Sequence, residues 1–152
     1  MPHAGEVSWG RFPYDKTLGE PGPEARPCLI LAVFEAGSRF QVLIAYGTTK
    51  LHRGLKAGEF LIDDRLAMTQ AGLTEETKFD LKNHTLLPYS DKWFEIAPGT
   101  GHPSPKMGDI SLVGKHRFRA ARAAANLDAI LTDYRMKRVG NANEVLTLPH
   151  DE

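Results

Sequence analysis

The sequence is poor in the residues and patterns on which several classes of protein depend. It contains a single cysteine, Cys28, which excludes an internal disulfide framework and a cysteine-rich zinc site. Cys28 lies within an apolar run, where a free cysteine ordinarily serves as a small hydrophobic side chain. The chain has no run of about 18 apolar residues, as a spanning helix requires, and its N-terminus lacks the signal-peptide pattern. These absences predict a cytoplasmic protein with no membrane association.

An excess of charge of either sign is also missing. The 19 lysines and arginines balance the 19 aspartates and glutamates, so no overall field draws the chain to a polyanion. A role in binding nucleic acid would therefore need a local cluster of positive side chains. The 152 residues suffice for one domain with a buried core, and they contain no internal repeat.

The most informative stretch is a pair of apolar runs, residues 26–34 and 41–50, separated by a turn at 35–38. Each run is short and rich in β-branched residues, which predicts a β-hairpin buried largely on both faces. In an antiparallel pair, the start of one strand lies beside the end of the next. We therefore expect Arg26 and Thr48 to lie at the same end of one sheet.

The rest of the chain predicts further short strands followed by one long C-terminal helix. Strands are expected at 6–12, 59–63, 78–83, 93–96 and 109–113, and residues 64–77 fit either a strand or a helical turn. Proline and glycine make 14–25 and 97–108 loops. From 115 to 138, apolar residues recur at spacings of three and four, which predicts one long amphipathic helix. The tail holds a short strand at 145–146 or is disordered.

These elements predict a mainly β fold with one long α-helix. Residues 1–114 would form a small, strongly bent β-barrel, and residues 115–152 a helix and tail packed on it within a single domain. Architecture alone does not decide function.

Four parts of the chain resemble the PemK/MazF-like toxin family of bacterial toxin–antitoxin modules. Residues 5–12 resemble its opening strand, and Arg26-Pro27 before an apolar run resembles its Arg-Pro signature. Thr48-Thr49 resembles its threonine-containing strand end. Residues 79–82 and 86–88 resemble a later strand of the PemK-like members. The resemblance covers roughly residues 5–95, and the segment after it has no clear counterpart in short members.

This resemblance implies an SH3-like barrel that often forms a dimer and cleaves messenger RNA, and that a cognate antitoxin protein inhibits. It places Arg26 at the family's catalytic arginine and Thr48, with Thr49, at its active-site threonine. Lys50 stands where well-studied members often carry glutamine. The implied reaction needs no metal and no cofactor, because the 2′-OH of the RNA can be the nucleophile.

The chemistry of these residues suits phosphate, but a proton-transfer group is less obvious. A planar arginine holds two phosphate oxygens and stays charged at any pH. A threonine hydroxyl orients a phosphate but is too weak a base to take the proton unaided. The candidate acid–base residues are His52, Glu24 and His84.

Binding of RNA would rest on a basic segment and one aromatic residue. Lys50, Arg53 and Lys56 would contact phosphates, and Tyr14 would stack on a base. Other interpretations stay open, in which Arg26 simply pairs with Glu24 and Thr48 only stabilises a turn. The alternative function is a catalytically inactive SH3-like module that binds a protein or nucleic-acid partner. An unrelated small enzyme or a structural protein is a third interpretation.

Overall fold

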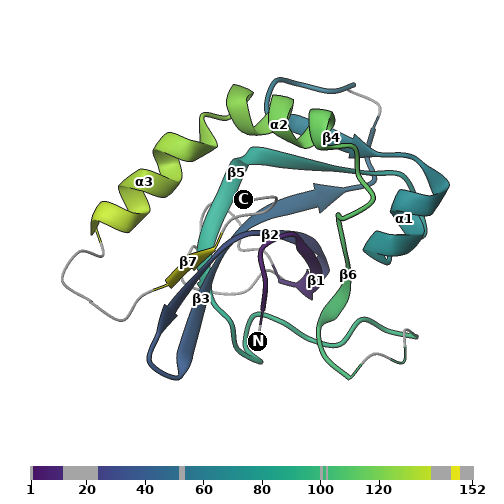
Figure 1. Cartoon of the computed structure of the whole chain (residues 1–152). Coiled ribbons are helices and arrows are strands. Elements are labelled where there is room, and N and C mark those ends of the chain that lie inside the picture. The colour runs from purple at the N-terminus through teal and green to yellow at the C-terminus, as the bar shows by residue number, and fades with distance from the viewer. Residues whose placement is uncertain are drawn as a thin grey trace.

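The computed structural model describes residues 2–11, 24–51, 54–99, 101, 103–137 and 145–147. Within them the chain is mainly β, with a curled antiparallel sheet and three helices (Figure 1). The strands are β1 (Glu6–Gly10), β2 (Arg26–Ala36), β3 (Arg39–Thr48), β4 (Glu59–Ile62), β5 (Thr77–Pro88), β6 (Lys106–Asp109) and β7 (Val145–Thr147). Their order in the sheet is β4-β5-β3-β2-β1-β6, and β7 pairs separately with β2. The helices are α1 (Arg65–Ala71), α2 (Lys115–Ala124) and α3 (Leu127–Lys137).

The predicted hairpin is confirmed and forms the centre of the sheet. β2 pairs antiparallel with β3, with Cys28 opposite Tyr46 and Ala36 opposite Arg39. Both faces of the hairpin are buried, because its side chains enter two separate apolar clusters on opposite sides of the sheet. A β-bulge at Leu31 adds one residue to β2, which reverses the inward–outward alternation beyond it.

The predicted single helix over 115–138 is wrong. The structure contains two helices, α2 and α3, separated at Ala125 and Asn126. Asn126 adopts a left-handed conformation with φ 54°, which asparagine tolerates better than most residues and which ends a helix. The break also places Leu127 fully inside the core, and an ion pair between Arg122 and Asp128 spans it.

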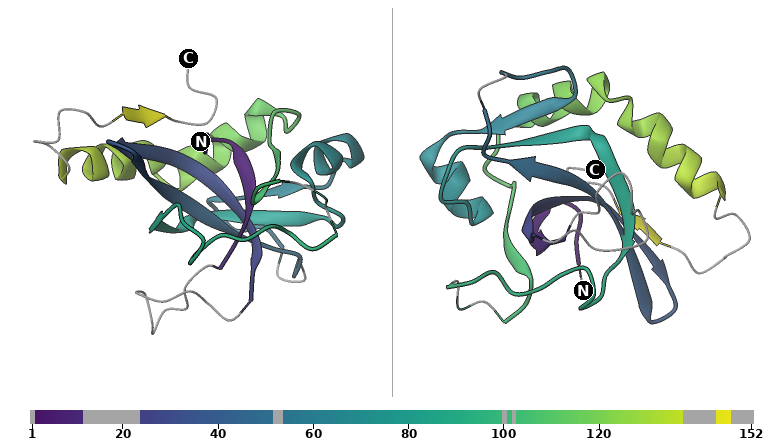
Figure 2. Two further views of the ribbon diagram at one scale, coloured as in Figure 1. Left: turned by 90° about the horizontal axis from the view of Figure 1, so that it is seen from below. Right: turned by 180° about the vertical axis from the view of Figure 1, so that it is seen from behind.

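Helices α2 and α3 pack on the same side of the sheet, as the views of Figure 2 show. In the layer between them and the sheet, Phe60 stacks on Phe118 of α2 with ring centroids 5.4 Å apart. Tyr134 of α3 lies 6.2 Å from the ring of Phe34. The apolar periodicity that predicted a helix therefore supplies a real packing face, although two helices share it.

The predicted strand at 109–113 is wrong in position. β6 comes earlier, at Lys106–Asp109, inside a segment expected to be a loop, and it pairs with β1. A side chain at Gly108 would overlap the backbone of Gln70 and Ala71 in α1, so glycine lets the two elements touch.

Residues 64–77, for which the sequence allowed a strand or a helical turn, contain the helix α1. Asp64 caps the first turn of this helix, and Gly72 ends it with φ 75°.

The predicted strand at 93–96 is wrong as well, because it contributes only an isolated bridge between Gly10 and Phe94. Phe94 and Trp93 are nonetheless buried in the second apolar cluster, with Cys28. A Cβ on Gly10 would lie 2.9 Å from the Phe94 ring, so glycine allows this ring to pack closely against β1.

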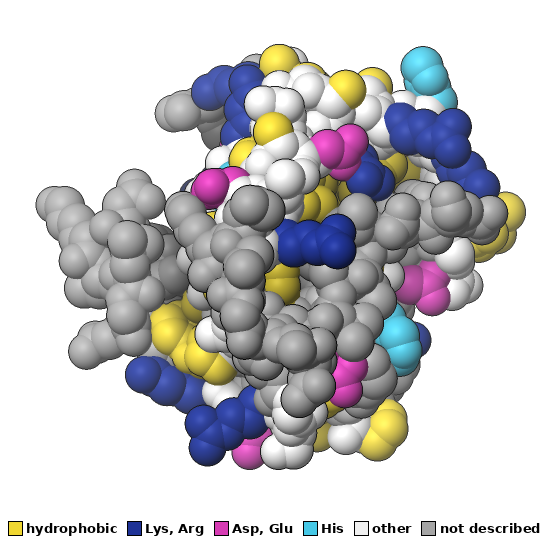
Figure 3. All heavy atoms as spheres, turned by 60° about the vertical axis from the view of Figure 1, so that its left-hand side comes forward, with side chains coloured by type: hydrophobic (Ala, Val, Ile, Leu, Met, Phe, Trp, Pro, Cys, Tyr) yellow, Lys and Arg dark blue, Asp and Glu magenta, His cyan; other side chains and the backbone are white. Residues whose placement is uncertain are grey.

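Figure 3 shows how charged side chains are distributed on one face of the molecule. On the face drawn in Figure 3, the described lysine and arginine side chains lie in separate groups among acidic and uncharged ones. None of the helices in the described part of the chain has the length and apolar character needed to cross a bilayer.

Candidate functional site

Arg26 and Thr48 line one cavity at the end of the sheet, where β2 begins and β3 ends. The cavity has a volume of about 300 Å³, at the lower end of the range for ligand pockets. Its lining comes from six parts of the chain: Trp9, Arg26, Pro27, Gly47, Thr48, Thr49, Gly72, Leu73, Thr74, Glu75, Thr77, Ala97, Pro98 and Met107. The antiparallel hairpin thus brings together Arg26, Thr48 and Thr49, the residues predicted as a catalytic group.

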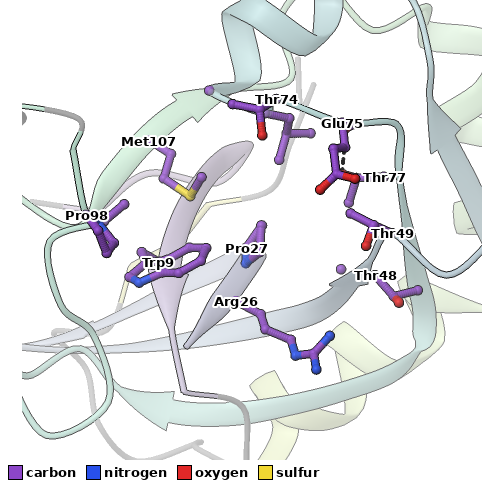
Figure 4. A pocket seen from close by; sticks show the side chains of 14 residues that line it. Trp9, Arg26, Pro27, Thr48, Thr49, Thr74, Glu75, Thr77, Pro98 and Met107 are labelled. Atoms are coloured by element: carbon purple, nitrogen blue, oxygen red, sulfur yellow. Dashed lines mark hydrogen bonds between the residues drawn. The ribbon is translucent and has the colours of Figure 1, made fainter. Parts of the chain in front are cut away.

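The cavity has an apolar wall and a polar wall (Figure 4). On one side stand Trp9, Pro98 and Met107, and on the other stand Thr48, Thr49, Glu75 and Thr77, with Arg26 extending along the lower rim. An apolar aromatic wall suits the flat face of a nucleobase, because bases stack on aromatic side chains. Hydroxyls and a carboxylate suit the polar groups of a nucleotide.

Neighbouring segments hold the apolar wall in place. The backbone N–H of Trp9 donates to Pro105 at 2.9 Å, and its carbonyl accepts from Glu95 at 3.0 Å. These two bonds tie β1 to Glu95 and Pro105 and so position the Trp9 indole. Gly47 lets β3 pack closely at this end of the sheet, since a Cβ there would lie 2.7 Å from the Phe79 ring and 2.9 Å from the carbonyl of Pro27.

Arg26 is partly exposed and already has two partners. Its Nη2 donates to Glu24 at 2.8 Å, and its guanidinium carbon lies 5.6 Å from the ring centre of Tyr46. The Arg26 side chain is 30% exposed and that of Glu24 is 65% exposed. An ion pair at this exposure contributes only about 0–1 kcal/mol, so an anionic ligand can displace the carboxylate at little cost.

Thr48 stabilises a turn through its hydroxyl oxygen and can still donate a hydrogen bond. Its Oγ1 accepts a hydrogen bond from the backbone N–H of Lys50 at 3.1 Å, as the turn-stabilising interpretation predicts. A hydroxyl that accepts in this way still has its O–H to donate. Thr48 can therefore offer a proton to a phosphate oxygen while its own position is fixed by the turn.

The structure describes two of the three candidate acid–base residues, Glu24 and His84. Glu24 pairs with Arg26 but, like His84, it is not among the residues that line the cavity. The Nδ1 of His84 lies 3.0 Å from the carbonyl of Leu81, and its ring meets Tyr134 edge-on. His84 pairs with Ala45 in β3, three residues before Thr48. His52 lies outside the described residues.

Glu75 is a carboxylate in the cavity that the sequence interpretation missed. It precedes β5, and Thr77 donates its hydroxyl to the Glu75 carbonyl at 3.0 Å. Since Thr48 pairs with Lys78, residues just before Lys78 lie beyond the end of β3, beside Thr49. The alternating pattern at 78–83 predicted the strand that follows Glu75. Placing Glu75 in the cavity also required knowing that this strand, β5, pairs with β3.

Of the predicted RNA contacts, Tyr14 and Arg53 lie outside the described residues. Lys50 and Lys56 do not line the Arg26 cavity; they line a neighbouring one, which shares Thr48 with it.

The thiol of Cys28 is fully buried. This burial raises its pKa to about 12, and the hydrogen bond from the thiol to the Gly10 carbonyl partly offsets the rise. Cys28 is therefore a core side chain, as its apolar surroundings predict.

Comparison with protein-family models finds no match, and comparison with curated proteins finds no significant relative. In the part of the chain that the structure describes, three or more histidine, cysteine, aspartate or glutamate side chains nowhere gather as a metal site would require.

Proposed function

We propose that this protein is a toxin-like endoribonuclease, an SH3-like barrel of the PemK/MazF-like kind that cleaves single-stranded messenger RNA. The observation that carries the proposal is the convergence of Arg26, Thr48 and Thr49 in one cavity at the end of the sheet. These are the positions at which the resemblance places a catalytic arginine and threonine. In this proposal the protein acts as a dimer, and a cognate antitoxin protein blocks the cavity.

The proposed reaction is an internal transesterification of RNA that uses no metal. The 2′-oxygen attacks the adjacent phosphorus, the bond from phosphorus to the 5′-oxygen breaks, and the products are a 2′,3′-cyclic phosphate and a 5′-hydroxyl. Glu75 accepts the proton of the 2′-OH, since its carboxylate lines the cavity and belongs to no described ion pair. Water protonates the departing 5′-oxygen and later takes the proton from Glu75.

Arg26 and Thr48 stabilise the charged phosphorane in this mechanism. The guanidinium is permanently charged and presents several N–H donors, of which Glu24 occupies one. The phosphate displaces Glu24, and the Thr48 hydroxyl donates to a second oxygen. A single well-aimed donor to a developing negative charge contributes about 3–4 kcal/mol, so loss of Arg26 should slow cleavage about 10²–10³-fold.

The decisive experiment is RNA cleavage in the presence of a chelator, comparing wild-type protein with Arg26→Ala and Arg39→Ala. Arg39 is an exposed arginine at the opposite end of the same hairpin, so its loss removes equal charge without touching the cavity. We expect Arg26→Ala to lose cleavage and Arg39→Ala to retain it, both with wild-type melting temperatures. Intact RNA after incubation with concentrated wild-type protein, across several substrates, would refute the proposal.

A second function, that of an inactive SH3-like binding module, is favoured by one observation. Arg26 is paired with Glu24, and Thr48 is bonded to the Lys50 backbone, so both have structural partners. In a binding module, Glu75→Gln would leave RNA intact as in the wild type. In the nuclease it would abolish the acidic limb of the pH–rate profile while leaving RNA affinity nearly unchanged.

A further inference from the structure

A second cavity, of about 410 Å³, borders the Arg26 cavity. It is lined by Tyr46, Thr48, Lys50, Lys56, Glu59, Lys78, Asp80 and Asn83, and is called the lysine cavity below. Thr48 lines both cavities, and the Arg26 guanidinium lies over the ring of Tyr46. Arg26 and Thr48 thus lie between two cavities, one with an apolar and a polar wall and the other lined by lysines.

The charges of the lysine cavity are arranged unevenly. Lys78 and Glu59 form an ion pair at 3.2 Å, with side chains only 7% and 8% exposed. Asp80 accepts a hydrogen bond from the backbone N–H of Lys82. Lys50 and Lys56 are exposed, and neither has a carboxylate partner among the residues that the structure describes. Within that part of the chain, Lys50 and Lys56 therefore line the cavity without a carboxylate partner, whereas the buried charges of Lys78 and Glu59 neutralise each other.

The buried pair also fixes the segment that carries Lys56. Glu59 Oε1 accepts the backbone N–H of Lys56 at 2.6 Å, and Lys78 Nζ donates to the carbonyl of Gly54 at 3.0 Å. This segment is not part of a strand or helix, so these bonds from buried charges hold its backbone. Lys56 therefore starts from an anchored backbone, which lowers the entropy cost when it binds an anion.

We propose that the lysine cavity binds the phosphate of the nucleotide next to the cleaved link, so that single-stranded RNA crosses Thr48 from one cavity to the other. Lys50 and Lys56 supply the charge, and the Asn83 amide supplies a neutral donor. Lysines bind phosphate without reading the base, so the interaction is sequence-independent. The order along the RNA rests on the proposed function, whereas binding itself does not require cleavage.

The test measures binding to a 2′-O-methyl RNA oligonucleotide, which has no free 2′-OH to attack the phosphorus. Fluorescence anisotropy of the labelled oligonucleotide gives Kd as a function of salt for wild type, Lys50→Ala/Lys56→Ala and Arg39→Ala. For single strands the slope of log K against log salt becomes shallower by about 0.7 for each phosphate that the protein no longer neutralises. Because both lysines neutralise the same phosphate, we expect the double variant to bind at least severalfold more weakly with a slope about 0.7 shallower, and Arg39→Ala to match wild type.

The outcomes separate this inference from the proposed function. A double variant with the wild-type slope and Kd, or a wild type that does not bind at low salt, would overturn the lysine cavity. Binding that depends on both lysines, together with unmodified RNA left intact by the wild type, would support the cavity and overturn the nuclease. Both lysines are exposed, so unchanged melting temperatures should accompany every variant.

Discussion

The buried ion pair between Lys78 and Glu59 provides the sharpest test of how this end of the sheet is held together. Lys78 Nζ bonds to Glu59 and to the Gly54 carbonyl, while Glu59 also accepts the backbone N–H of Lys56. Both side chains are less than one-tenth exposed. Removing one member of such a pair leaves a buried charge without its counterpart, which typically costs about 3–5 kcal/mol.

We expect Lys78→Met to fall at the lower end of that range, about 3 kcal/mol. Glu59 would keep the Lys56 N–H, and the lysine cavity admits water to the exposed edge of the pair. For a chain of this size, 3 kcal/mol corresponds to a fall in Tm of about 6–12 °C. Urea unfolding followed by circular dichroism measures the change in the free energy of unfolding.

The matched variant is the double substitution Lys78→Met/Glu59→Gln, which removes both charges. Because replacing an entire buried pair by neutral groups is often nearly neutral, the double variant should be more stable than Lys78→Met alone. The coupling free energy from the double-mutant cycle should then be about 1–3 kcal/mol. A destabilisation below about 1 kcal/mol for Lys78→Met, or additive effects of the two single substitutions, would refute the view that the two charges depend on each other.

Three further predictions concern packing and protonation. Gly108→Ala should lower the free energy of unfolding by about 1–3 kcal/mol, measured in urea, because its Cβ would overlap the backbone of α1. Partial burial tends to raise the pKa of Asp109, but hydrogen bonds from Ser111 and Gln70 outweigh it and lower that pKa. The stabilisation is therefore present above about pH 4 and lost as the pH falls through the lowered pKa; Asp109→Asn should remove this acid dependence from unfolding curves. Cys28 should resist alkylation at neutral pH in the folded protein and react in urea, as mass spectrometry would show; fast alkylation of folded protein would contradict its burial.

The position of the candidate site followed from local patterns in the sequence. Apolar runs of strand length around a short turn determine an antiparallel hairpin, and antiparallel geometry alone places Arg26 beside the end of β3. The burial of Cys28 followed in the same way, from its place inside an apolar run. These conclusions depend on neighbours within one hairpin, which is why sequence could supply them.

Tertiary structure decided everything that depends on pairing between distant segments. Glu75 reaches the cavity because β5 pairs with β3, and Trp9 is held in the cavity wall by backbone hydrogen bonds with Glu95 and Pro105. The helix break at Asn126 and the earlier position of β6 arise from packing against the sheet and α1, which periodicity does not record. Sequence placed the arginine and the threonine at one end of a sheet, and long-range packing built the two cavities around them.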